Sequence, residues 1–214
     1  MKINLFSETI GTSFLLLIVV GSGIMGENLT ENKAVVLLAN SITTAFGLIV
    51  LIWIFGSYSG AHFNPVVSIL MMLLGRLTKQ EMLFYVLCQI IGGVAGVVLA
   101  NVIFDLDIIS ISDNRRLTTG VFISEVIATF GLLLTILLVS KQKPEMVAAA
   151  VGLYIGAAYW FTSSTSFSNP AVTIARTLSD TFTGIVPSDV VPFIFAQLIG
   201  TFIVYFIYKY VYEQ

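Results

Sequence analysis

Two Asn-Pro pairs, each followed by a small apolar residue, are the residues of this chain with the clearest chemical meaning. They stand at Asn64-Pro65-Val66 and Asn169-Pro170-Ala171, each after a polar stretch and before a short apolar segment. Pro fits the first position of a helix, because its missing N–H would have no intrahelical partner there. Asn fits the N-cap position just before it. Both pairs therefore predict the start of a helix, and each side-chain amide can donate a hydrogen bond as well.

The elements that position these pairs must lie in a membrane. Of the 214 residues, 57% are hydrophobic and only 10% are charged, whereas a soluble domain carries about 25% charged residues. The mean hydropathy is +0.98. A spanning helix needs about 20 apolar residues, and the apolar segments 64–75 and 169–178 are too short to cross. We predict that they are re-entrant half-helices beside a wet path, because irregular backbone at membrane depth must be buried in protein or line water. The predicted spans are 6–25, 34–55, 82–104, 119–140, 145–162 and 190–210.

The two halves of the chain repeat one order of motifs. Glu8 and Glu125 each lie near the start of a span, an Asn-Pro pair follows in each half, and Gln89 and Gln197 lie in the third span of each half. Each half has three spans, an odd number, so the copies must insert with opposite topology. The half-helices would then meet with their N-termini facing each other. We predict one domain over 1–214, with repeats at about 1–107 and about 115–214.

Two helix N-termini that face one point would exclude ions from a path beside them. Each N-terminus carries about half a positive charge, and the amides of Asn64 and Asn169 can donate to a passing oxygen. A water held by two donors cannot easily relay a proton, while neutral polar molecules pass. Carbonyl oxygens of the preceding loops would accept hydrogen bonds from the solute. The candidate carbonyls are those of Gly60, Ala61, His62, Ser164, Thr165 and Ser166.

Other features exclude further kinds of site. The single Cys88 rules out an internal disulfide, and one His without a Cys/His cluster gives a metal site little support. We expect no cofactor and no nucleic-acid partner. Glu8, early in the first span, argues against a cleavable signal. Two pairs of glycines are predicted to pack helices within the chain, at Gly92-x-x-x-Gly96 and Gly152-x-x-x-Gly156.

The distribution of Lys and Arg predicts the orientation. With the N-terminus in the cytoplasm, the inner side holds six of these residues and the outer side four. Cytoplasmic loops carry the excess of positive residues in membrane proteins. We therefore predict a multi-pass protein of the plasma (cell inner) membrane with both termini in the cytoplasm.

The block Ser59-Gly60-Ala61-His62-Phe63-Asn64-Pro65-Val66, the second Asn-Pro-Ala and the paired Glu and Gln residues resemble the aquaporin (major intrinsic protein) family over nearly the whole chain. The resemblance implies an all-α membrane protein with an aquaporin-like fold, in which six transmembrane helices and two re-entrant half-helices form an inverted repeat. It also implies a pore in each subunit of a homotetramer in the lipid bilayer. Glu8 and Glu125 would hold the half-helix loops in place rather than relay protons.

The largest departure from the family lies at the selectivity filter. Most members have Arg directly after the second Asn-Pro-Ala, where this chain has Val172. Counted without gaps, the four filter positions are Thr44, Ala157, Ser166 and Val172, with Ala158 or Tyr159 as alternatives for the second of them. This filter would be wide and carry no cation. It resembles that of a bacterial branch of the family without the filter arginine, which is associated with arsenite handling.

One arginine close to the filter has two interpretations. Arg176 follows Val172 by one helical turn. It either reaches water at the outer mouth and pairs with Asp180, or partly replaces the missing charge. Long basic side chains usually reach for water or an acid, which favours the first interpretation.

We expect a passive channel for water and small neutral solutes of the glycerol, urea or metalloid acid type, which excludes protons and ions. A strict water channel is the nearest alternative. A secondary transporter is the alternative of another class, since inverted repeats also build transporters. It would need carboxylates near the midplane, and apart from Glu145 at the first residue of its span only Glu8 and Glu125 lie inside spans. No nucleophile–base pair supports an enzyme.

Overall fold

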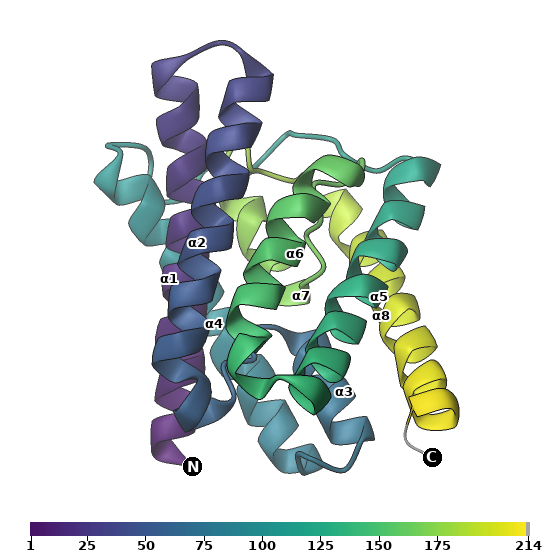
Figure 1. Cartoon of the computed structure of the whole chain (residues 1–214). Coiled ribbons are helices and arrows are strands. Elements are labelled where there is room, and N and C mark those ends of the chain that lie inside the picture. The colour runs from purple at the N-terminus through teal and green to yellow at the C-terminus, as the bar shows by residue number, and fades with distance from the viewer. Residues whose placement is uncertain (213–214) are drawn as a thin grey trace.

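The computed structural model describes residues 1–212, and these form helices joined by loops, without a strand. Figure 1 shows the helices side by side, with the start of α1 and the end of α8 at the same end of the molecule. We call this the termini end and the other the opposite end. The prediction of an all-α fold is confirmed. The α-helices are α1 (Lys2–Leu29), α2 (Lys33–Ser59), α3 (Pro65–Leu73), α4 (Lys79–Ile103), α5 (Thr119–Gln142), α6 (Val147–Phe161), α7 (Pro170–Ala175) and α8 (Val190–Ile207).

Five of these helices are long and apolar enough to cross a membrane: α1, α2, α4, α5 and the segment Pro187–Tyr212 that contains α8. The sixth predicted span, 145–162, corresponds to the 15 residues of α6 and the 3₁₀ turn Pro144–Met146 before it. At 1.5 Å per residue α6 alone is about 22 Å long, shorter than a hydrocarbon core of about 30 Å. Several helices extend past their predicted spans, because the helix continues into polar sequence at its ends.

The two half-helices begin as the Asn-Pro pairs predict. Asn64 is the N-cap of α3, and its Oδ1 accepts a hydrogen bond from the N–H of Val66 at 3.0 Å. Asn169 is the N-cap of α7, and its Oδ1 accepts from the N–H of Ala171 at 2.9 Å. Both helices are short, with 9 and 6 residues, so neither can cross a bilayer.

Small residues allow the long helices to approach closely. A Cβ atom at Gly92 of α4 would lie 2.2 Å from the carbonyl oxygen of Thr9 in α1. A Cβ atom at Gly152 of α6 would lie 2.5 Å from the carbonyl oxygen of Ala45 in α2. Because both contacts are with backbone, a larger residue would push the helices apart. The prediction that these glycines pack helices within the chain is confirmed.

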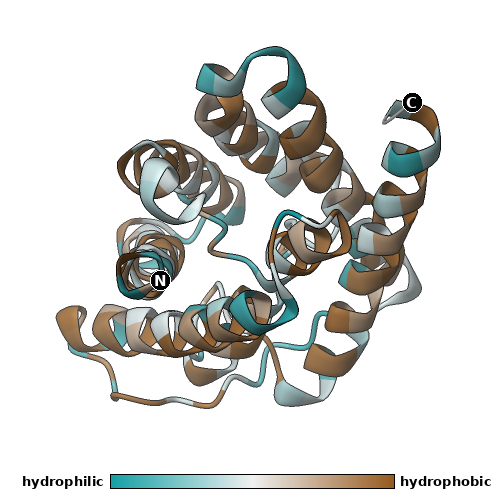
Figure 2. Cartoon of the chain, turned by 90° about the horizontal axis from the view of Figure 1, so that it is seen from below, coloured by the Kyte–Doolittle hydropathy of each residue, from teal (hydrophilic) through white to brown (hydrophobic). Residues whose placement is uncertain are grey.

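Polar and apolar residues are distributed as in a protein that lies in lipid. Figure 2 shows the hydrophilic colour gathered at helix ends and in loops, while hydrophobic colour runs along the helices. Large apolar side chains such as Trp53 and Leu153 are 63% and 62% exposed. Glu8, Gln89 and Glu125 are fully buried. In the membrane, buried polar groups must find hydrogen-bond partners inside the protein.

Candidate functional site

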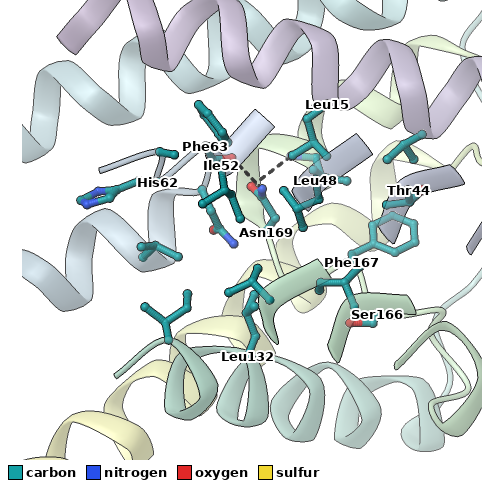
Figure 3. Close-up of a pocket in the computed structure, with 18 of the residues that line it drawn as sticks. Leu15, Thr44, Leu48, Ile52, His62, Phe63, Leu132, Ser166, Phe167 and Asn169 are labelled. Atoms are coloured by element: carbon teal, nitrogen blue, oxygen red, sulfur yellow. Dashed lines mark hydrogen bonds between the residues drawn. The ribbon is translucent and has the colours of Figure 1, made fainter. Parts of the chain in front are cut away.

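A cavity of about 290 Å³ lies inside the bundle and is the candidate functional site. Figure 3 shows His62 at one end of it, Thr44 and Ser166 at the other, and Asn169 between them. Within residues 1–212 its wall contains no Asp or Glu, while Arg176 contributes a positive charge. This wall offers hydrogen-bonding groups without a carboxylate, which suits a neutral solute better than a cation.

Half of the wall-lining residues come from one face of each of four helices. Residues four apart lie on the same face of an α-helix, and the wall-lining residues follow this spacing. The stripes are mostly apolar, so polar groups are confined to a few positions in the wall. The stripes are Leu15 and Val19 on α1, Thr44, Leu48 and Ile52 on α2, Leu132, Ile136 and Ser140 on α5, and Val147, Val151, Ile155 and Tyr159 on α6.

The two Asn side chains meet across the middle of the cavity. Nδ2 of Asn64 donates to the carbonyl oxygen of Ser168, and Nδ2 of Asn169 donates to that of Phe63, both at 2.8 Å. These crossed hydrogen bonds bring the N-termini of α3 and α7 together. Since an amide NH₂ group carries two hydrogens, each Asn retains one N–H for a solute, and both residues line the cavity.

Glu8 anchors the loop before α3. Its carboxylate accepts hydrogen bonds from the Ser59 hydroxyl at 2.6 Å and from the N–H groups of His62 and Phe63 at 3.0 and 2.8 Å. Nε2 of Gln89 donates to the same carboxylate at 2.7 Å. With four donors around it, this carboxylate is occupied as an acceptor, which supports the loop-holding role that the family resemblance implies.

Glu125 does the same for the loop before α7. It accepts from the N–H groups of Phe167 and Ser168, both at 2.9 Å, and from Nε2 of Gln197 at 2.7 Å. Gln197 also donates to the Thr173 hydroxyl at 3.0 Å, just as Gln89 donates to the Ser68 hydroxyl at 2.9 Å. The paired Glu and Gln residues found in the sequence thus occupy matching places in the structure.

Both loops have left-handed backbone at residues other than glycine. The φ angles are 48° at Ala61 and Phe63, 51° at Ser166 and 46° at Ser168. Such a conformation costs on the order of 1 kcal/mol or more per residue and persists only where its surroundings impose it. The two carboxylates do so by fixing adjacent N–H groups in each loop.

Not all the predicted carbonyl positions reach the cavity. Gly60, Ala61 and His62 line it, and Ser166 does so in the second loop. Ser164 and Thr165 are not among the lining residues. The Ser164 hydroxyl accepts a hydrogen bond from the N–H of Ser166 at 3.1 Å.

The His62 ring is held by its neighbours at the termini end of the cavity. Its Nδ1 lies 3.0 Å from the Ser68 hydroxyl oxygen, and its ring packs edge-on against Tyr85 with the centroids 5.2 Å apart. These contacts hold the ring in one orientation beside the cavity.

Three of the four predicted filter residues lie in the wall, and one does not. Thr44, Ser166 and Val172 line the cavity, while Ala157 lies on the exposed side of α6. Tyr159, the stated alternative, lines the cavity in its place, and its hydroxyl is 3.2 Å from the Thr44 hydroxyl. The count placed this position wrongly because helical spacing decides which side of α6 faces the cavity. Residue 159 continues the stripe with residue spacing of four, and residue 157 does not.

Sequence reasoning missed Phe167 as a wall residue and misjudged Arg176. Arg176 is only 3% exposed and lines the cavity, with its Cζ 3.6 Å from the centre of the Phe167 ring. Its Nε donates to the carbonyl oxygen of Thr183. Asp180 instead accepts from the Ser112 hydroxyl and the N–H of Asp113. The predicted pairing of Arg176 with Asp180 is wrong, and the cavity wall carries a cation outside the four predicted filter positions.

The whole chain is similar to known membrane channels in fold. An X-ray structure of the aquaglyceroporin from Plasmodium falciparum superposes with a TM-score of 0.74, covering 98% of this chain and 96% of that one. The two sequences are 22% identical, so this likeness concerns the fold. It confirms the predicted aquaporin-like architecture.

Sequence comparisons identify the family. Aquaglyceroporin AqpS of Rhizobium meliloti (strain 1021) is 48% identical over 91% of this chain and 83% of its own length. Aquaporin NIP1-2 of Arabidopsis thaliana is 30% identical over 72% of this chain and 54% of its own length. The family model for major intrinsic protein matches residues 2–166. The chain therefore belongs to the major intrinsic protein family, whose members are channels and not enzymes.

Proposed function

We propose that the chain is a passive transmembrane channel for water and small neutral solutes of the glycerol, urea or metalloid acid type, and that it excludes protons and ions. The observation that carries this proposal is the cavity between the two half-helices, with both Asn amides in a wall that contains no carboxylate within residues 1–212. A mostly apolar wall with a few hydrogen-bonding groups accommodates a molecule that has both CH and OH groups. The relative from Rhizobium meliloti, whose name is aquaglyceroporin, supports the same solute class.

We propose that Thr44, Tyr159, Ser166 and Val172 form the filter, without an arginine directly after the second Asn-Pro-Ala. The hydroxyls of Thr44 and Tyr159 are 3.2 Å apart, so they close one side of the path. Val172, directly after Ala171, adds an apolar surface to the wall. A polyol could then turn its oxygens to the hydroxyls and its carbon chain to Val172.

A strict water channel is the second candidate, and the structure offers one observation in its favour. Tyr159, Phe167 and Arg176 line the cavity, and all three are larger than the residues that the sequence predicted for the filter. These bulky side chains narrow the path. The fluxes of glycerol and water separate the two candidates.

The test is flux into liposomes that contain the purified protein, followed by stopped-flow light scattering with water, glycerol, urea and arsenite. A channel gives fast, non-saturating flux that does not depend on a sodium or pH gradient. Saturation or dependence on either gradient would favour a transporter instead. Water flux without flux of the larger solutes would favour the strict water channel.

Two tryptophan variants link that flux to the cavity. Val151→Trp fills the cavity, because Val151 lines it and is 5% exposed. Leu153→Trp is the matched control, because Leu153 lies two residues away on the outer surface and is 62% exposed. We expect the first variant to abolish flux and the second to retain it. Equal flux in both variants would show that solutes take another route.

We also propose a homotetramer in the plasma (cell inner) membrane, with cytoplasmic termini and repeats at about 1–107 and 115–214. The exposed apolar side chains along the helices support contact with lipid or with other subunits. Cross-linking in native membranes tests the tetramer. Reporter fusions at each terminus test the orientation, and a reporter active only outside the cytoplasm should stay silent at both ends.

A further inference from the structure

Two arginines from distant parts of the chain converge on one ring at the opposite end of the cavity. The Cζ atom of Arg176 lies 3.6 Å from the centre of the Phe167 ring, and that of Arg116 lies 5.4 Å from it. Figure 3 shows Phe167 beside Ser166 at the end of the cavity away from His62. Two guanidinium groups on one aromatic ring interact favourably with its π electrons but repel each other.

The same two arginines bind three successive carbonyl groups, which we call the 182–184 strap. Arg116 donates from Nε to Gly184 and from Nη2 to Phe182, both at 2.6 Å, and Arg176 donates from Nε to Thr183. An arginine side chain has five N–H donors in a fixed plane. The strap therefore sets the orientation of the Arg176 guanidinium and leaves its two Nη groups available to a molecule in the cavity.

No carboxylate neutralises these side chains directly. Within residues 1–212 neither guanidinium forms an ion pair, and the nearby acids bind backbone instead. Asp189 accepts from the N–H groups of Arg116 and Leu117, and Glu27 accepts from the N–H of Phe182. Burial lowers the pKa of Arg116, which lies in the loop between α4 and α5, to about 10, so it remains charged at neutral pH. The opposite end of the cavity is therefore positive.

We infer that two groups of side chains select solutes at the opposite end of the cavity, a charged stage at Arg176 and an uncharged stage at Thr44, Tyr159 and Val172. The inference rests on the proposed channel function. Arg176 follows Val172 by four positions, which corresponds to about 6 Å along a helix axis. Arg176 is a specificity-determining residue that repels cations and donates hydrogen bonds to a neutral solute. The uncharged stage selects solutes by size and polarity. Arg116 is a positioning residue that acts through the strap.

The test separates the two stages by measuring two fluxes in the same liposomes. Arg176→Gln removes the charge and keeps an amide donor, so the ratio of sodium and proton leak to glycerol flux should rise about tenfold or more. Val172→Ala is the matched control, because it widens the uncharged stage and leaves both arginines in place. It should raise glycerol flux without raising the leak. Arg176→Met provides a second uncharged side chain of similar length should the glutamine variant fail to insert.

Arg116 is tested by the ratio of sodium leak to glycerol flux, which does not depend on how much protein is folded. Arg116→Gln should raise this ratio about threefold or more, because the strap no longer orients Arg176. Arg116→Lys should restore it in part, because lysine can still donate to one carbonyl. A merely structural role would lower both fluxes together and leave the ratio unchanged.

The outcomes distinguish this inference from the proposed function. If the native protein conducts glycerol and neither uncharged variant at position 176 raises the cation leak, the charged stage is wrong and the channel stands. If the native protein gives no flux at all, the proposed function itself is wrong. A leak that rises equally in Val172→Ala would mean that the two stages are one.

Discussion

The loops before the two half-helices are held in the same way but place different side chains beside the cavity. Glu8 fixes the N–H groups of His62 and Phe63, and Glu125 fixes those of Phe167 and Ser168. The first loop then presents a His ring, whereas the second presents a Phe ring with Arg176 over it. The duplicated hydrogen bonds thus build the middle of the path, and the side chains that differ between the copies give its two ends their character.

The largest expected effect comes from removing the shared anchor. Glu8→Leu would leave the donors of Ser59, His62, Phe63 and Gln89 without their acceptor, at about 1–3 kcal/mol for each buried group. That sum approaches the whole stability of a typical domain, about 5–15 kcal/mol. We expect almost no folded protein by size-exclusion chromatography in detergent.

The corresponding change in the second half sharpens the comparison. Glu125→Leu removes the acceptor of Phe167, Ser168 and Gln197, so we expect a large but somewhat smaller loss. Glu8→Gln and Glu125→Gln are the controls, since each keeps one acceptor oxygen and should retain more folded protein. A folded, conducting Glu8→Leu protein would contradict the anchoring role.

The next effect concerns two glycines at matching places in the halves. A Cβ atom at Gly92 would lie 2.2 Å from the Thr9 carbonyl oxygen, and one at Gly200 would lie 2.6 Å from that of Val126. Gly92→Ala should therefore destabilise by about 1–3 kcal/mol, and Gly200→Ala by less. Thermal unfolding in detergent measures both.

A third glycine provides the control for these two. Nothing lies within 4 Å of a Cβ atom at Gly56 in α2. Because alanine favours helix over glycine by up to about 1 kcal/mol, Gly56→Ala should be neutral or stabilising. Destabilisation equal to that of Gly92→Ala would show that the loss comes from something other than helix contact.

The sequence predicted the parts of this structure that depend on local or repeated signals. Asn64 and Asn169 cap their half-helices, because an Asn-Pro pair favours the N-cap and first helical positions regardless of the rest of the chain. Glu8 and Gln89 could be paired with Glu125 and Gln197 because the order of motifs repeats. Such signals do not depend on which face each helix turns toward the interior.

The cavity wall could be predicted only in part, because it depends on which face each helix turns inward. Ala157 was placed there by a count from the motif, yet Tyr159 continues the stripe of Val147, Val151 and Ile155. That spacing of four was present in the sequence and could have identified the face. Arg176 could not be placed, because its partners are the Thr183 carbonyl and a ring that comes from another loop.

The third prediction concerns the filter, at the end of the cavity that carries Arg176. Val172→Arg puts a second cation one turn before Arg176 and fills space that the apolar side chain leaves open. We expect glycerol flux to fall about tenfold while water flux is retained. The range of conducted solutes would then narrow toward water. Light scattering with both solutes measures the ratio. Unchanged glycerol flux would remove Val172 from the filter.

The smallest effect decides between two neighbouring positions on α6. Tyr159→Ala removes the ring and the hydroxyl that lies 3.2 Å from Thr44, so the uncharged stage should widen and glycerol flux should rise about threefold. Ala157→Val changes a residue that faces outward and should leave the flux within experimental error. Since both substitutions lie on one helix two residues apart, a general disturbance of α6 would alter both proteins. Because valine is larger than alanine, a fall in glycerol flux in the Ala157 variant alone would return the filter position to residue 157 and would require α6 to turn a different face toward the cavity.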